Sequence, residues 1–585
     1  MSAPASRAGA WPIIRAYWVS PDSGPGWRLL AAVIALDLAL VWRAARITYW
    51  QKDFYDALQQ LNEAAFWPQL AALAALALTG LVLNTARTWL AQSLEMRWRA
   101  WMTEEHLRRW LAGNAFWRLE RDQGDQGEGG GLENADQRMA EDLRMVASGT
   151  LTLGLGLISN FVSLLTFSAI VWGLSGALTI TLGGQTLQVP GYMLWVAFIY
   201  ALGGSWAIEK IGGRMVQIDY RQQQAEADFR AALLRIRESA EQIALYGGES
   251  AERARLSARF AAVRRNWRDI MNYTKRITIA DNAYTEVGAL VPYMLQGPRL
   301  FKGIITLGDL TQLIQSFMRV RVALSWFIYK YKDLALLRSA LARLAEFDAA
   351  LQAAEAASNH TQDNAQDSAA RVPHITRQSG SATGGYTLQD VQALGPRGRP
   401  LTPVVNWRIA PGERWMLRGP SGAGKSTLLR ALAGLWTHGH GHIATPPGAA
   451  AAPRAETLFV PQQSYLPIDT LRACLAYPAL ETAFSDDDCQ AALRWACLPA
   501  LTHRLHESAH WARQLSPGEQ QRLAFARIWL HRPRWLFLDE ATSALDEETE
   551  ERLYARLTRD LPGLTLVSIA HRSSLRRFHE HEMQL

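Results

Sequence analysis

Residues Gly419–Thr427 read GPSGAGKST, and this stretch decides the fold of the C-terminal part of the chain. It fits the P-loop pattern G-x-x-x-x-G-K-[ST], with a strand-like run before it and a helix-like run after it. In such a strand–loop–helix unit the glycines let backbone N–H groups point at phosphate oxygens. We expect Lys425 to reach the β- and γ-phosphates of ATP and Ser426 to bind Mg²⁺. The candidate ATP-binding residues of this loop are Gly419, Pro420, Ser421, Gly422, Ala423, Gly424, Lys425, Ser426 and Thr427.

A second stretch with chemical meaning lies downstream, where Trp535–Glu540 reads WLFLDE. An apolar run that ends in two acids is common by itself, but this one follows a P-loop. The order predicts a buried strand that places Asp539 near Mg²⁺ and Glu540 near the water that attacks the γ-phosphate. We therefore interpret Glu540 as the general base and Asp539 as a metal ligand.

Between these stretches, Leu515–Gln521 reads LSPGEQQ. It resembles the signature segment of ATP-binding cassette (ABC) ATPases, which is usually LSGGQ, and it departs from that form at Pro517 and Glu519. The same residues also describe a helix start, with a serine N-cap followed by proline at the first position. The two interpretations agree, because a helix N-terminus is itself a site for anions. The candidate ATP-binding residues here are Leu515, Ser516, Gly518 and Glu519.

The other elements of an ABC ATPase follow in order. Val460–Gln463 (VPQQ) resembles the Q-loop, Ser543–Asp546 (SALD) the D-loop and Ser568–Arg572 (SIAHR) the switch segment. The resemblance covers Tyr386–Leu585 and implies ATP and Mg²⁺ as cofactors. The roles it implies are catalysis for Lys425, Gln462, Glu540 and His571, metal contact for Ser426, Gln462 and Asp539, and ATP contact for Asp546.

One element of the family is missing. ABC domains usually stack adenine on an aromatic side chain upstream of the P-loop, where this chain has Gly395. Tyr386 or Trp407 could take that role, and the sequence leaves the choice open.

The N-terminal part alternates apolar segments with basic links, and several segments reach the length of about 20 residues that spans a bilayer. Buried helices of a large soluble protein are the alternative, but long segments with so few charges seldom recur there. The link Ser175–Val189 has no charge, whereas the links after the second and fourth segments are rich in arginine. The positive-inside rule therefore places the N-terminus and both long links in the cytoplasm. The six segments are roughly Leu29–Ala45, Leu70–Leu90, Leu151–Leu174, Pro190–Ile208, Ile277–Leu295 and Leu307–Tyr329.

These features predict three regions. Residues 1–345 form a transmembrane domain with long cytoplasmic helices, among them Arg221–Leu245; residues 346–385 are a flexible linker by composition; residues 386–585 are the nucleotide-binding domain. The fold class is an α-helical six-span membrane domain, similar to type IV ABC exporters, fused to an α/β P-loop ABC ATPase domain.

The membrane half resembles a narrower branch. Asn134–Arg138 (NADQR) is similar to the NPDQR motif of SbmA/BacA-like bacterial transporters and of peroxisomal subfamily D half-transporters, with Ala135 as a departure. Arg97–Trp101, Trp110–Leu119 and Glu226–Gly247 match the same branch. The resemblance implies uptake of bulky hydrophilic solutes, such as peptides, bleomycin-like compounds or cobalamin, across a bacterial inner membrane. The peroxisomal members would imply acyl-CoA instead.

Acidic residues inside the apolar segments bear on the cargo. Asp37, Asp281 and Glu286 would be costly facing lipid, so we expect them to face a water-filled cavity or a polar partner. Carboxylates in a cavity would suit cationic or hydrophilic cargo. For Asp281 a position at the membrane interface is an equally good interpretation.

Net charge and cysteine content bear on which functional classes the chain can belong to. The net charge of +7 permits nucleic-acid binding, but the basic residues fall mostly between apolar segments, which argues against it. Three cysteines without CxxC spacing form neither a disulfide framework nor a metal site. The sequence therefore predicts an ATP-driven half-transporter that works as a homodimer, each composite site joining the P-loop of one copy to the LSPGE of the other. The rivals are an exporter of drugs, peptides or lipids and an ATP-gated channel or sensor.

Overall fold

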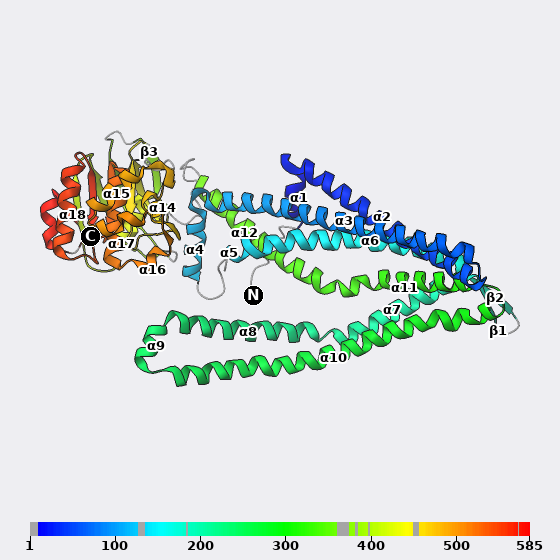
Figure 1. Ribbon diagram of the computed structural model, residues 1–585. Coiled ribbons are helices and arrows are strands. Elements are labelled where there is room, and N and C mark those ends of the chain that lie inside the picture. Colours follow the sequence, from blue (N-terminus) through cyan, green and yellow to red (C-terminus); the bar gives the residue numbers. More distant parts are fainter. Residues whose placement is uncertain are drawn as a thin grey trace. The chain divides into compact units, whose positions relative to one another are not determined.

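The computed structural model describes residues 10–126, 135–182, 185–359, 374–380, 384–395, 398–447, 456–570 and 572–585. The chain forms two compact units (Figure 1). Unit 1 comprises Met1–Arg108 and Asn134–Ala349, and unit 2 comprises Arg109–Glu133 and Ala350–Leu585.

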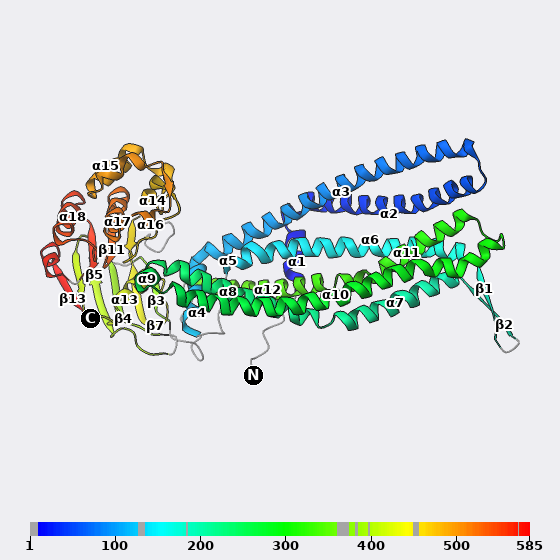
Figure 2. The ribbon, with the colours of Figure 1, turned by 60° about the horizontal axis from the view of Figure 1, so that its bottom comes forward.

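Unit 1 consists of long helices (Figures 1 and 2). Five of the six apolar segments lie within one helix each, and the fourth does so from Tyr192 onward. By length and composition alone, two helical stretches of the described residues, Glu63–Glu120 and Ala135–Ser175, are apolar enough to cross a membrane. The other four segments lie in helices that carry more polar or charged side chains. The helices that contain the six segments are α2 (Gly24–Gln59), α3 (Glu63–Leu111), α6 (Leu143–Ser175), α7 (Tyr192–Gly212), α10 (Glu249–Phe301) and α11 (Leu307–Tyr329).

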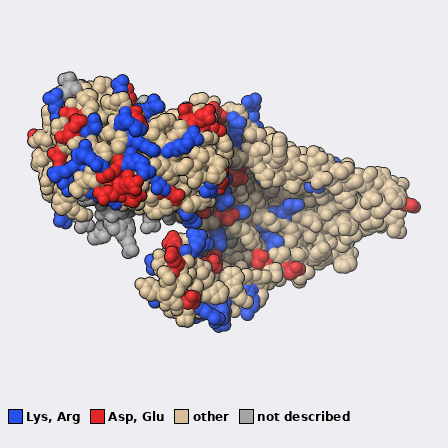
Figure 3. Space-filling model, turned by 60° about the vertical axis from the view of Figure 1, so that its left-hand side comes forward, with Lys and Arg blue, Asp and Glu red and all other residues tan. Residues whose placement is uncertain are grey.

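The links of unit 1 follow their composition. The uncharged link is an antiparallel hairpin of β1 (Ala177–Leu182) and β2 (Gln185–Pro190). The arginine-rich link after α7 is helical as predicted: α8 (Met215–Glu238) runs to Ser239, and α9 (Ala240–Tyr246) ends at Gly247 in the left-handed conformation, which glycine adopts without strain. In Figure 3 the surface of unit 2 carries many charged side chains, whereas the narrow end of unit 1 carries very few. The remaining helices of unit 1 are α1 (Ala10–Val19), α5 (Ala135–Gln137) and α12 (Tyr331–Asn359), whose last turns belong to unit 2.

Helix α11 is the central element of unit 1, because it packs against α2, α6, α7 and α10. Its buried side chains Leu313, Phe317 and Val320 form one cluster with Phe167 of α6 and Ala197 of α7. Their spacing of three and four residues places them on one side of α11, as an apolar helix face requires.

Unit 2 contains two sheets. The first has the order β13-β6-β12-β11-β8, and all its neighbours are parallel. The second has the order β3-β7-β4-β5. The strands are β3 (Thr376–Ser379), β4 (Tyr386–Ala393), β5 (Val405–Ile409), β6 (Arg414–Arg418), β7 (Gly439–Thr445), β8 (Thr457–Val460), β11 (Trp535–Asp539), β12 (Thr565–Ile569) and β13 (His581–Gln584), with a short pair β9 (Asp469–Thr470) and β10 (Ser508–Ala509).

Strand β11 shows how the layers form. Trp535 and Phe537 point to a core that includes α13 and both sheets, whereas Leu536 and Leu538 point to a core that includes α17 and α18. A strand covered on both faces is apolar at every position, which is why WLFL does not alternate. A third cluster joins α14, α15 and α17. The helices of this unit are α4 (Ala115–Gln126), α13 (Lys425–Leu432), α14 (Leu471–Ala476), α15 (Asp486–Trp495), α16 (Trp511–Gln514), α17 (Pro517–His531) and α18 (Glu547–Asp560).

The prediction of a flexible linker over residues 346–385 is too wide. Helix α12 continues to Asn359, and strand β3 begins at Thr376. Arg109 Nε lies 3.0 Å from Glu355 Oε1, and Trp117 of α4 packs against the core of unit 2. Composition did not predict the helix here because an alanine-rich stretch resembles a low-complexity linker. Alanine also has the highest helix propensity, and α12 is helical. Residues 360–373 lie outside the described ranges.

Candidate functional site

The candidate site lies at one edge of the parallel sheet. Strands β6, β12, β11 and β8 are successive neighbours, so their carboxyl ends meet at the same edge. Leu417 pairs with Ile569, Ile569 with Asp539, and Leu538 with Val460. The residues that follow these strands are the P-loop, Glu540 and the Q-loop segment. The topology thus brings the P-loop and the Q-loop segment together with Glu540, which follows the P-loop by more than one hundred residues.

The P-loop connects β6 to α13, as its pattern predicts. Lys425 is buried, and its Nζ donates to the carbonyl oxygens of Gly419 (2.8 Å) and Pro420 (3.0 Å). Gly424 has φ +88°, and a Cβ there would lie 2.2 Å from the carbonyl oxygen of Leu401. Only glycine fits this position. The loop therefore depends on Leu401, which the sequence did not single out.

Asp539 and Ser426 form the candidate metal site. Ser426 Oγ donates to Asp539 Oδ1 over 2.9 Å, so two oxygen ligands lie side by side at the start of α13. Burial raises the pKa of Asp539, and nearby Glu540 raises it further, whereas the hydrogen bond from Ser426 opposes this. A bound cation would favour the charged carboxylate. A hydroxyl and a carboxylate are the hard oxygen donors that Mg²⁺ selects when phosphates complete its shell.

Glu540 has an unusual backbone. Its φ is +49°, a conformation that costs energy for a residue with a side chain and that is found at functional sites. Its amide donates to the carbonyl of Ile569 over 3.1 Å, and its Oε2 accepts from Gln462 Nε2 over 3.0 Å. The Q-loop glutamine and the expected general base are therefore in contact.

The LSPGE segment is the start of α17. Ser516 is the N-cap, its side chain accepts from the amide of Glu519, and the Glu519 carboxylate accepts from the amide of Ser516 over 2.9 Å. These hydrogen bonds, the one from the backbone first, lower the pKa of Glu519. The helix-start interpretation is confirmed, with Pro517 at the first helical position. Since a capping box occupies Ser516 with Glu519, a phosphate would compete with that contact.

Helix α17 is tied to the D-loop. Gln521 Nε2 donates to Ser543 Oγ over 3.1 Å, and Gln521 Oε1 accepts from the amide of Ala544 over 2.8 Å. Asp546 caps α18 by accepting from the amide of Thr549, and this backbone hydrogen bond lowers its pKa. The sequence did not identify Gln521 as a link between the signature and D-loop segments. His571 lies outside the described residues.

Neither Tyr386 nor Trp407 can be the aromatic partner of adenine, which corrects the prediction that one of them could take that role. Tyr386 is fully buried between Trp535 and Phe537, and Trp407 lies in the same core. Both side chains lie on the core face of their strands, so neither can stack on a base. A hollow of about 270 Å³ lies beside the P-loop, lined by Arg418, Gly419, Pro420, Glu582 and Gln584.

Of the three carboxylates expected to face a cavity or a polar partner, Asp37 has a polar partner. It is buried and accepts from Arg87 Nε of α3 over 2.9 Å. Asp281 is half-buried and accepts from the hydroxyl of Tyr329 over 2.5 Å. Glu286 is exposed, on the side of α10 opposite its buried stripe.

The ion pair of Asp37 with Arg87 leads to a stability prediction. We expect Asp37→Asn to leave Arg87 without its partner and to destabilise the folded protein by about 1–3 kcal/mol, less than for a fully buried pair because Arg87 keeps some solvent contact. Thermal unfolding of the detergent-purified protein measures this. The double variant Asp37→Asn/Arg87→Gln should cost less than the sum of the two single variants. Strict additivity would show that the pair does not interact.

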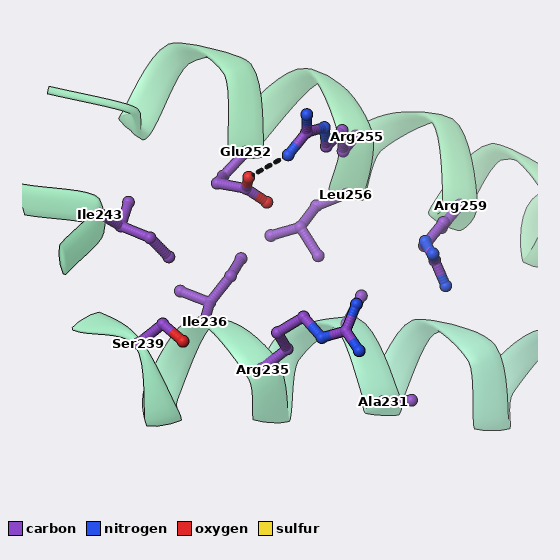
Figure 4. A pocket seen from close by; sticks show the side chains of 10 residues that line it. Ala231, Arg235, Ile236, Ser239, Ile243, Glu252, Arg255, Leu256 and Arg259 are labelled. Atoms are coloured by element: carbon purple, nitrogen blue, oxygen red, sulfur yellow. Dashed lines mark hydrogen bonds and ion pairs between the residues drawn. The ribbon is translucent and has the colours of Figure 1, made fainter. Parts of the chain in front are cut away.

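The basic links of unit 1 contain two further features. Arg138 of the NADQR motif is buried in a π-helical turn (Arg138–Asp142), and its Nη1 donates to the carbonyl of Arg343 over 2.6 Å. A groove of about 590 Å³ lies between α8 and α10 near α9 (Figure 4). Ile236, Ile243 and Leu256 form its apolar floor, and three arginines rim it: Arg235, Arg255 and Arg259.

Comparisons with known proteins define the class. The family model for ABC transporter transmembrane region 2 matches residues 13–301, and the ABC transporter model matches residues 403–543. The chain belongs to the ABC transporters that carry a membrane domain and an ATPase domain in one polypeptide. It is 31% identical to the inner membrane ABC transporter ATP-binding protein YddA of Escherichia coli, over 96% of this chain and 94% of that protein.

Other relatives extend into the D subfamily. The chain is 28% identical to the chloroplastic ABC transporter D family member 2 of Arabidopsis thaliana, covering 97% of this chain and 84% of that protein. It is 27% identical to the mouse lysosomal cobalamin transporter ABCD4, covering 100% and 97%. The structure of a bacterial Atm1-family ABC exporter with ATP bound has a TM-score of 0.67 at 19% identity, covering 95% of this chain and 93% of that one, which shows a shared fold. The chain is thus a membrane transporter that binds and hydrolyses ATP. Membership of the SbmA/BacA-like branch stays a prediction.

Proposed function

We propose that this chain moves bulky hydrophilic solutes, of the peptide, bleomycin-like or cobalamin-like kind, inward across a bacterial inner membrane. The carrying observation is the set of polar side chains on its membrane helices, such as Asp281, Glu286 and Arg319, which a path for lipids would not require. The name of a cobalamin transporter among the relatives supports the same cargo class.

Two copies form the working unit in this proposal. Each chain has one P-loop and one LSPGE segment, and within the described residues no hydrogen bond or ion pair joins them. Two ATP molecules would each lie between the P-loop of one copy and Ser516 of the other, with Mg²⁺ held by Ser426 and Asp539 and oriented by Gln462. Glu540 would accept the proton of the attacking water, and Lys425 and His571 would contact the γ-phosphate. A two-fold homodimer is the simplest arrangement.

Coupling is proposed to run through the helical links near Asp136–Arg138 and Glu226–Tyr246. These segments leave the membrane helices of unit 1 and would lie in the cytoplasm with the ATPase domain, as the arginine distribution predicts. The groove between α8 and α10 belongs to this region.

Transport by purified protein in liposomes tests the function. We expect ATP-dependent movement of labelled peptides, a bleomycin-type glycopeptide or cobalamin, and none with Glu540→Gln. ATP added on the side of the ATPase domain fixes the direction, because uptake would move solute toward that side. Movement away from it would replace uptake by export, and transport restricted to acyl-CoA would favour the peroxisomal type. Passive flux that ATP opens, without accumulation of solute against its gradient, would indicate an ATP-gated channel.

A further inference from the structure

Helix α11 has one open side. It packs against α2, α6, α7 and α10. From Gln315 onward its exposed residues, together with the partly exposed Trp326, are spaced by four and three residues. That spacing places them on a single face. The face consists of Gln315, Arg319, Val322, Trp326 and Tyr329, and we call it the α11 stripe.

Arg319 lies in the middle of this stripe. It is 12 residues after Leu307 and 10 before Tyr329, so the helix ends are roughly 18 and 15 Å away. For the predicted membrane segment Leu307–Tyr329, an arginine side chain at this position is too short to reach either interface. A charge held at this depth against lipid is costly, and such residues face water or a polar partner.

None of the described carboxylates of the apolar segments pairs with Arg319. It makes no hydrogen bond or ion pair among the described residues. Asp37 is held by Arg87, Asp309 lies 2.5 Å from Lys52, and Asp281 accepts from Tyr329. Glu286 lies on α10, turned away from the stripe Tyr284, Gly288, Pro292 and Gln296 that the same helix buries.

Arg321, two residues away on the same helix, shows the contrast. It is buried, its guanidinium lies 4.9 Å from the ring centre of Tyr284, and its Nη1 donates to Thr285 Oγ1 over 3.4 Å. Arg321 therefore has a structural role between α10 and α11, while the charge of Arg319 is left for a ligand.

We propose that Arg319 binds an anionic group, a carboxylate or a phosphate, on the transported solute. The neighbouring Gln315 adds a hydrogen-bonding amide, and Trp326 and Tyr329 add aromatic surface, so the cargo class is an anion with an apolar or ring-bearing body. This inference rests on the proposed function, and it replaces the expectation that cavity carboxylates select cationic cargo.

The first test measures whether water reaches the α11 stripe and whether its electrostatic potential is positive. Gln315→Cys is made in a chain carrying Cys497→Ser, because Cys474 and Cys489 are buried. Its thiol is reacted with an anionic sulfonate and a cationic trimethylammonium methanethiosulfonate of similar size. The measured quantity is the ratio of the labelling rate of the anionic reagent to that of the cationic reagent. We expect this ratio to be about tenfold higher with Arg319 than with Arg319→Gln. Arg46→Gln, which removes an exposed arginine of α2, is the matched control and should not change the ratio.

The second test uses transport of three fluorescent tetrapeptides that differ only in acidic, neutral or basic side chains. We expect Arg319→Gln to lower accumulation of the acidic peptide about tenfold relative to the neutral one, and Arg319→Lys to retain most of it. Equal loss for all three peptides would overturn the proposal.

Absence of labelling in every nucleotide state would also overturn it. If adding Glu286→Gln then restored the stability lost in Arg319→Gln, Arg319 would be assigned to an ion pair with Glu286 of the second copy. If wild-type protein moves none of the peptides, peptide transport fails as the function, while the labelling ratio still decides whether Arg319 attracts anions.

Discussion

Glu540→Gln is expected to slow ATP hydrolysis by roughly 10²- to 10⁴-fold while ATP remains bound. The amide cannot accept a proton from the attacking water, but it keeps the size of the carboxylate and the contact of residue 540 with Gln462. The P-loop is untouched, since Lys425 and Ser426 are held by Gly419 and Asp539. Phosphate release by the purified protein, together with binding of radiolabelled ATP, measures both halves of this prediction.

The matched control is Glu548→Gln. Glu548 is an exposed acid of α18 that pairs with Arg552 on the same helix, so its replacement should leave hydrolysis near the wild-type rate. Lys425→Ala should differ from Glu540→Gln by weakening ATP binding itself, because the lysine contacts phosphate in the bound state. Wild-type hydrolysis by Glu540→Gln would show that another residue is the base.

The second large effect is recovery of activity in a mixed dimer. A homodimer of Lys425→Ala and a homodimer of Ser516→Arg should both be nearly inactive, because each variant damages both composite sites. In a heterodimer of the two, the intact P-loop of one chain faces the intact LSPGE of the other, so one of the two sites is restored. We expect this heterodimer, isolated through two different affinity tags, to hydrolyse ATP far faster than either parent.

A heterodimer as inactive as its parents would mean that both sites must be intact or that Ser516→Arg disrupts α17. The thermal stability of Ser516→Arg separates these outcomes, because loss of the N-cap alone costs about 0.5–2 kcal/mol. Full activity from a proven monomer would exclude a composite site altogether.

Local motifs were enough to predict the ATPase half. GPSGAGKST specifies its own backbone, because glycine at positions such as Gly424 is what allows a left-handed turn against Leu401. WLFLDE predicts a strand buried on both faces, and Ser516 with Pro517 predicts a helix start. The apolar segments likewise predicted long helices, and two helical stretches, Glu63–Glu120 and Ala135–Ser175, are apolar enough to cross a membrane by length and composition.

Contacts between residues that are distant in sequence could not be predicted from local patterns and are seen only in the tertiary structure. Asp37 and Arg87 are 50 positions apart, so the local sequence around Asp37 does not predict their ion pair. The local sequence also does not predict that Glu286 is exposed. Tyr386 is an aromatic residue in a suitable place along the chain, but strand alternation turns it into the core. Arg319 and Arg321 are near neighbours in sequence, yet helix geometry turns one toward Tyr284 and leaves the other on the open side of α11. The ATPase motifs can be read from sequence, because each places its side chains through the backbone conformation of a few adjacent residues. Burial and side-chain pairing depend on packing between helices and strands that are distant in sequence, so they appear only in the folded chain.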